Sequence, residues 1–201
     1  MKKIILTVSA VFAFGFMDAQ ETKFGVKGGV NFATLTGDAE DVSMKVGFNV
    51  GGFVEIKVSD KFSVQPELLY STQGARTEIS EFDGFNFDAK VNLGYLNIPI
   101  MARYYVANKF SLEAGPQVGF LLSAKGKAEV MEGGVTTSAE EDIKDEFESI
   151  DFGVNFGAGY DFTKNLSANV RYNFGLTNIA KDSGNDKANN SVLSLSLGYK
   201  F

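Results

Sequence analysis

Residues 151–162 read Asp151-Phe152-Gly153-Val154-Asn155-Phe156-Gly157-Ala158-Gly159-Tyr160-Asp161-Phe162, with an apolar side chain at every even position and Asp, Gly or Asn at every odd one. Successive side chains of a strand point to opposite faces, so this segment has one apolar face and one polar or small face. The same alternation recurs along the chain. It predicts eight strands, over about residues 23–35, 44–58, 62–76, 91–106, 110–124, 149–162, 166–178 and 191–201.

The connections between these strands alternate in length. Residues 59–61, 107–109 and 163–165 are tight turns, whereas residues 36–43, 77–90, 125–148 and 179–190 are long and polar. Short turns at one end and long loops at the other are typical of an up-and-down antiparallel meander, which eight tilted strands can close into a barrel.

The apolar face of each strand lies either inside or outside this barrel. A secreted, soluble, lipocalin-like carrier of a small apolar ligand has it inside, and a membrane barrel has it outside, against lipid. Three features favour the membrane: small residues on the polar face, aromatic residues near strand ends, and a last strand that carries Tyr199 and Phe201. Such a terminal strand is typical of the insertion signal that the barrel-assembly machinery reads. We therefore expect an all-β, eight-stranded transmembrane barrel, with the soluble carrier as the alternative.

The N-terminal segment has the features of an export signal. Lys2 and Lys3 precede an apolar run over residues 4–16, which is too short to span a membrane as a mature helix. We expect residues 1–20 to be a signal peptide, cleaved after Ala19 or Gln20. Residues 21–201 then form a single barrel domain in a bacterial outer membrane, with both termini in the periplasm.

Composition excludes much of enzyme chemistry. The chain has no Cys and no His, which removes disulfides, zinc–thiolate sites, Ser-His-Asp triads and the commonest general base. A net charge of −6 argues against a nucleic-acid partner. We expect no cofactor, no metal and no catalysis, although a lipid-modifying barrel enzyme is a third alternative. The expected partners are outer-membrane lipid and, during insertion, the assembly machinery.

Charged residues also occur on the polar face of the predicted strands. Mixed charges in a narrow lumen are expected to pair with one another and plug the barrel, because an unpaired buried charge is costly. An ion path and carboxylate catalysis are the functional alternatives. The predicted lumen network consists of Glu55, Glu67, Arg103, Glu113, Asp151, Arg171 and Lys200.

Residues 125–148 form the most acidic predicted loop, with a net charge of −5. A solvated loop is one interpretation. A surface for an extracellular or secretion-system protein, or for a divalent cation held by oxygen ligands, is the other. Its exposed acids are Glu140, Glu141, Asp142, Asp145, Glu146 and Glu148.

The three prolines, Pro66, Pro99 and Pro116, fall inside predicted strands. Because proline cannot donate a ladder hydrogen bond, we expect local bulges or missing ladder bonds there.

The segments around these prolines carry a resemblance to a known family. Residues 62–70 (FSVQPELLY), followed by Gln73-Gly74-Ala75, then residues 95–99 (YLNIP) and 112–119 (LEAGPQVG), resemble the PorT-like outer-membrane β-barrel family of the Bacteroidota. The resemblance covers essentially residues 21–201. It implies a small outer-membrane barrel, and its founding members are tied to protein secretion across the outer membrane.

Overall fold

The computed structural model describes residues 21–37, 43–82, 85–132, 135–181 and 187–201, so the expected signal peptide lies outside the described residues. Within these ranges, one short 3₁₀ helix, η2 (Lys144–Glu146), interrupts an otherwise all-β structure. The strands are β1 (Thr22–Gly37), β2 (Ser43–Lys57), β3 (Phe62–Phe82), β4 (Phe85–Ala107), β5 (Phe110–Glu132), β6 (Val135–Asp142), β7 (Ile150–Asp161), β8 (Leu166–Gly175) and β9 (Ala188–Lys200).

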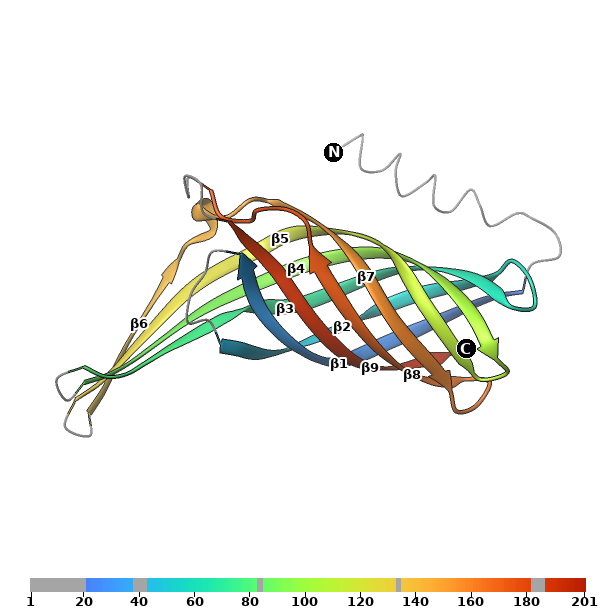
Figure 1. Ribbon diagram of the computed structural model, residues 1–201, viewed down its shortest axis with the longest axis horizontal. Coiled ribbons are helices and arrows are strands. Elements are labelled where there is room, and N and C mark those ends of the chain that lie inside the picture. Colours follow the sequence, from blue (N-terminus) through green and yellow to red (C-terminus); the bar gives the residue numbers. More distant parts are fainter. Residues whose placement is uncertain (1–20, 38–42, 83–84, 133–134, 182–186) are drawn as a thin grey trace.

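Eight of these strands close into an antiparallel ring, which confirms the predicted barrel (Figure 1). The hydrogen-bonded order is β4-β3-β2-β1-β9-β8-β7-β5, and pairing of β4 with β5 closes the ring. The first half of β5 pairs with β7, and its second half pairs with β6. β6 is therefore a ninth strand outside the ring, which the sequence pattern did not predict.

The pairing register sets the tilt of the strands. A row of directly paired residues that starts at Phe110 of β5 returns to β5 at Phe120, a stagger of ten residues. With eight strands, this stagger corresponds to a tilt of about 40°. The row passes through Phe110, Tyr160, Ala168, Leu197, Gly28, Val50, Tyr70, Leu96 and Phe120.

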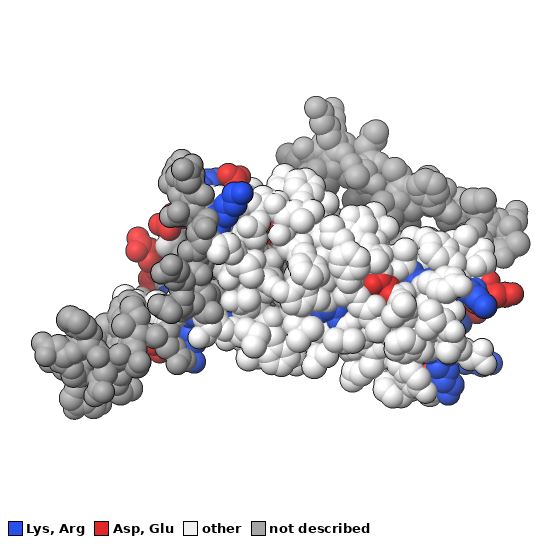
Figure 2. All heavy atoms as spheres, viewed as in Figure 1, with Lys and Arg blue, Asp and Glu red and all other residues white. Residues whose placement is uncertain are grey.

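The apolar face of the ring points outward. On β7, Phe152 and Phe156 are 52% and 53% exposed, whereas Asp151 and Asn155 are 6% and 1% exposed. Figure 2 shows the result as a broad, largely uncharged face between charged residues at the two ends of the molecule. The soluble carrier with an apolar interior is therefore wrong for this chain, because the apolar side chains cover the outside. Among the described residues, no helix is long and apolar enough to cross a membrane.

Two of the predicted long loops are mostly strand. From Arg76 on β3 and Lys125 on β5, the strands continue past the ring and form, with β6, a four-stranded sheet that projects from the loop end (Figure 1). We call this sheet the arm; it comprises residues 76–82, 85–91, 125–132 and 135–142. The prediction failed because polar runs are typical of loops, whereas here they form strands that pair with one another beyond the ring.

Cross-strand ion pairs connect the strands of the arm. Arg76 binds Asp88 at 2.5 Å, and Lys125 of β5 binds Glu140 of β6 at 2.6 Å. Hydrogen bonds from these cations lower the pKa of the Asp88 and Glu140 carboxyl groups. Opposite charges on neighbouring strands favour strand pairing, although each exposed pair contributes little. The strands of the arm are therefore joined by charged side chains as well as by the backbone ladder.

The prolines interrupt the ladders without shifting the register. Between β3 and β4, pairing stops after Pro66 and resumes at Leu69 in the same register. Between β4 and β5, it stops after Pro99, opposite Gln117, and resumes at Ala102. Of the two expected outcomes, the structure has missing ladder bonds rather than bulges at these points.

Two adjacent glycines on β2 allow a matched test of how closely neighbouring strands pack in the wall of the ring. A Cβ at Gly51 would overlap the backbone carbonyl oxygen of Leu68, whereas one at Gly52 would lie 3.6 Å from the nearest atom, the oxygen of Gly25. We expect Gly51→Ala to lower the free energy of unfolding by about 1–3 kcal/mol, because the clash moves backbone. Gly52→Ala should change it by less than about 0.5 kcal/mol. Urea unfolding in detergent micelles measures both, and equal effects would contradict the described packing.

Candidate functional site

Each of the eight ring strands contributes one charged side chain to a network that lies in the lumen, toward the end with the tight turns. We call these eight residues the lumen network. Four are cations and four are anions, so their formal charges cancel, and all except the partly buried Asp161 are at least nine-tenths buried. The members, from β1 to β9, are Lys27, Glu55, Glu67, Arg103, Glu113, Asp161, Arg171 and Lys200.

Arg171 is the centre of the inner half of this network. Its Nη1 and Nη2 donate to the two carboxylate oxygens of Glu67, both at 2.9 Å, in a bidentate pair. Nη2 also donates to Glu113 at 3.2 Å. Glu67 accepts further bonds from Lys27 Nζ at 3.0 Å and Gln65 Nε2 at 2.7 Å. This half of the network therefore connects four strands that lie on different sides of the lumen.

Arg103 and Lys200 form the outer half, closer to the tight turns. Arg103 Nη1 donates to Glu55 at 2.8 Å, and Lys200 Nζ donates to the same carboxylate oxygen at 2.9 Å. Lys200 also reaches Asp161 at 3.3 Å, which accepts a bond from the hydroxyl of Tyr105 at 3.1 Å. Arg103 Nε lies 3.7 Å from Glu113 and so joins the two halves.

Burial decides what this arrangement contributes to stability. Removing two charges from water costs several kcal/mol, which close pairing and further hydrogen bonds offset only when the geometry is good. Removing one partner of a buried pair leaves the other charge uncompensated, at a cost of about 3–5 kcal/mol. The lumen network therefore stabilises the closed barrel only as a complete set.

The structure brings together six of the seven sequence-predicted lumen residues, and Asp151 is the exception. Asp151 lies ten positions before Asp161 on β7, toward the loop end, where it accepts a hydrogen bond from Asn190 Nδ2 at 2.8 Å. Sequence reasoning missed Asp161 and Lys27, although both have the inward parity of their strands. Parity identifies the face of a strand but not the height in the barrel, and height depends on the stagger of the ring.

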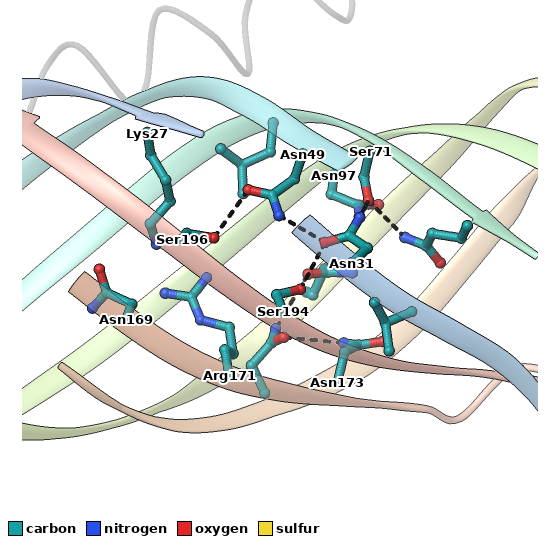
Figure 3. Close-up of a pocket in the computed structure, with 15 residues that line it drawn as sticks. Lys27, Asn31, Asn49, Ser71, Asn97, Asn169, Arg171, Asn173, Ser194 and Ser196 are labelled. Atoms are coloured by element: carbon teal, nitrogen blue, oxygen red, sulfur yellow. Dashed lines mark hydrogen bonds between the residues drawn. The ribbon is translucent and has the colours of Figure 1, made fainter. Parts of the chain in front are cut away.

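On the loop-end side of the lumen network, neutral amide and hydroxyl side chains form hydrogen bonds across the lumen (Figure 3). Asn49 Nδ2 donates to Asn31 Oδ1 at 2.6 Å, and Asn31 Nδ2 donates to Ser71 at 2.9 Å. Ser194 and Ser196 of β9 donate to the same two asparagines. The cavity among these side chains is about 30 Å³, which has room for a water molecule or two and nothing larger.

Apolar side chains close the loop end of the lumen. Tyr95 and Leu93 of β4 pack there with Phe147 and Ile179, which come from the segments before β7 and after β8. Phe147 and Ala180 form an isolated bridge that holds these two segments together. We call this group the apolar cap; its buried members are Leu93, Tyr95, Leu121, Ala124, Phe147 and Ile179.

The six predicted acids of residues 125–148 are all exposed, but they do not lie on a loop. Glu140, Glu141 and Asp142 end β6, Asp145 and Glu146 lie in η2, and Glu148 follows. The expected solvated loop is corrected to a strand and a 3₁₀ turn, because the backbone of residues 135–142 pairs with β5. Across the described ranges, no three acidic side chains are grouped as a metal site would need.

Tyr199 and Phe201 lie on the outer face of the ring, 49% and 72% exposed, with ring centroids 5.5 Å apart. Other aromatic side chains of the tight-turn end, including Phe24, Tyr104 and Tyr160, are also exposed. Aromatic girdles of this kind mark the interface between lipid and water in membrane barrels.

A closed ring, an apolar outer face and a filled polar lumen define a transmembrane β-barrel. A family model described as the outer membrane protein beta-barrel domain matches residues 6–181, and the chain belongs to this family. The protein is thus an outer-membrane β-barrel protein.

Solved structures with similarity to this chain include two bacterial outer-membrane proteins. Ail, the attachment invasion locus protein of Yersinia pestis, is 15% identical, with 90% of this chain and 99% of Ail covered and a TM-score of 0.48. OprG from Pseudomonas aeruginosa is 14% identical, with 90% and 97% covered and a TM-score of 0.44. No curated protein matches the sequence.

Truncation of Arg171 tests the lumen network. Arg171→Ala leaves Glu67 and Glu113 buried with fewer cations, so we expect a loss of about 3–5 kcal/mol in the free energy of unfolding. Arg76→Ala, which breaks an ion pair of the half-exposed arm, is the matched control and should cost about 1 kcal/mol or less. Urea unfolding in micelles compares the two, and equal losses would show that the lumen network does not stabilise the barrel.

Proposed function

We propose that this outer-membrane protein is a non-conducting, non-catalytic barrel whose role is to present the arm to a protein partner. The observation that carries the proposal is the filled lumen. From the tight turns to the loop end, the lumen network, the layer of amide and hydroxyl side chains and the apolar cap succeed one another. They leave a central cavity of about 30 Å³, and a wider cavity of about 640 Å³ opens only at the tight-turn end, beside Glu55, Asp161 and Lys200. This filling supports a plug over an ion path.

The same lumen also supports the absence of catalysis. Each of the four carboxylates in the lumen network binds a lysine or an arginine, so none is free to act as an acid or base. General acid–base catalysis needs a carboxyl group within reach of a substrate. The central cavity has no room for a substrate, and the two carboxylates that line the cavity at the tight-turn end, Glu55 and Asp161, both bind Lys200. We propose no cofactor and no nucleic-acid partner.

The arm supports the interaction role. Residues 137–142 of β6 are exposed, and β6 pairs with one neighbour, β5, among the described strands. Glu141, Asp142 and the acids of η2 give this surface a negative charge, which favours a basic segment of an extracellular or secretion-system protein. A role in supporting secretion agrees with the resemblance to the PorT-like family of the Bacteroidota.

The proposal includes an orientation and a route to the membrane. Residues 1–20 are removed as a signal peptide after Ala19 or Gln20, and the barrel-assembly machinery inserts the remaining chain. The tight turns and both chain termini then face the periplasm, and the arm lies outside the cell. This orientation is supported by the alternation of short turns and long loop-end extensions, as in other outer-membrane barrels.

Conductance tests the plug. Folded protein inserted in planar bilayers should give no steady current, because the lumen has no continuous water path. The folded fraction is recognised by a heat-dependent mobility shift in SDS. Reproducible current steps from that fraction, lost after boiling, would contradict the plug and favour the ion path.

Single cysteines test the orientation, and the chain has none of its own. Thr137→Cys on the arm should react with a membrane-impermeant maleimide on intact cells, whereas Lys61→Cys in a tight turn should react only after lysis. Both side chains are exposed, so accessibility to the reagent is matched. The reverse labelling pattern would overturn the proposed orientation.

A further inference from the structure

The outer wall of the barrel has a groove that the lumen and the arm do not explain. Its volume is about 470 Å³, within the range of ligand pockets in proteins, and it crosses β5, β7, β8, β9 and β1. Its lining combines glycine and alanine with larger apolar side chains. The lining includes Gly28, Phe110, Ala158, Tyr160, Ala168 and Leu197.

The register gives the direction of this groove. Phe110, Tyr160, Ala168, Leu197 and Gly28 are successive members of one paired row, which climbs toward the loop end because of the ten-residue stagger. At a tilt of about 40°, each step to the next strand rises by about 3 Å, so four steps rise by about 12 Å. That is about half of an apolar band about 25 Å tall. The groove therefore spans one leaflet, from the tight-turn interface to the membrane centre.

Positive charge lies at the interfacial end of the groove. Lys109 immediately precedes Phe110, is exposed, and donates to the carbonyl of Phe162 at 3.3 Å. Lys164 is exposed in the turn that follows Phe162. The nearest acid on these strands, Asp161, points into the lumen and binds Lys200. Neither lysine lines the groove itself: both line the cavity at the tight-turn end, with Asp161 and Lys200, and their exposed side chains lie at the level of the aromatic girdle.

We propose that this groove is a binding site for one anionic phospholipid, with an acyl chain along Ala158 and Ala168 and a phosphate beside Lys109 and Lys164. Its placement in the periplasmic leaflet rests on the orientation proposed above. A second copy of this chain fits less well. A parallel two-fold dimer across the groove brings the Lys109 and Lys164 side chains of both copies together, and like charges at an interface repel.

Native mass spectrometry of the folded protein, released from detergent with phosphatidylglycerol or phosphatidylcholine added, tests the proposal. We expect one phosphatidylglycerol per chain to be retained in preference to phosphatidylcholine. Lys109→Ala and Lys164→Ala should each weaken retention about fivefold, the equivalent of about 1 kcal/mol per lysine. Lys61→Ala removes an exposed lysine of another turn and should leave retention unchanged.

Filling the groove with a larger side chain is the second part of this test. Ala168→Leu should abolish the retained lipid, whereas Ala114→Leu, at a partly buried position of the outer wall that does not line the groove, should not. The mobility shift in SDS verifies that each variant is folded. Equal retention of the two lipids, full retention by Ala168→Leu, or a lipid-free dimer that Ala168→Leu dissociates would each overturn the proposal. Since lipid retention is measured in detergent, it is independent of conductance and of labelling on cells.

Discussion

A bilayer contains no hydrogen-bond partners for the backbone, so a sheet that crosses it has to close on itself. Closure of eight strands encloses a narrow space, and the inward side chains have to satisfy one another there. In this protein each ring strand contributes one residue to the lumen network, whose four cations and four anions pair across that space. Pairing of charges within the lumen network therefore allows this ring to close around polar side chains.

The remaining features follow from that closure. The apolar residues that alternate with the lumen side chains necessarily form the lipid-facing wall. At the loop end, Phe147 and Ile179 fold over Tyr95 and seal the lumen without further charges. The arm can leave the ring because β3, β4, β5 and β6 continue to pair with one another in water, where cross-strand ion pairs replace lipid contacts.

Much of this fold is predictable from alternation and connection length. These signals identified the eight ring strands, the tight turns and the polar face that carries Glu67 and Arg171. They did not identify β6, because a strand exposed to water on both faces has the composition of a loop. Nor could they distinguish Asp151 from Asp161, which share a parity. The choice between them depends on the stagger of the ring, which arises from pairing among all strands.

The lumen network implies that its members depend on one another energetically. A double-mutant cycle for Arg171 and Glu67, measured by urea unfolding of the micellar protein, tests this directly, with Arg76 and Asp88 of the arm as the reference pair. The lumen network predicts that Arg171→Met and Glu67→Gln together cost much less than the sum of the single changes, with a coupling of about 1–3 kcal/mol that exceeds the reference pair. Additive losses at Arg171 and Glu67 would contradict the claim that paired charges hold this lumen closed.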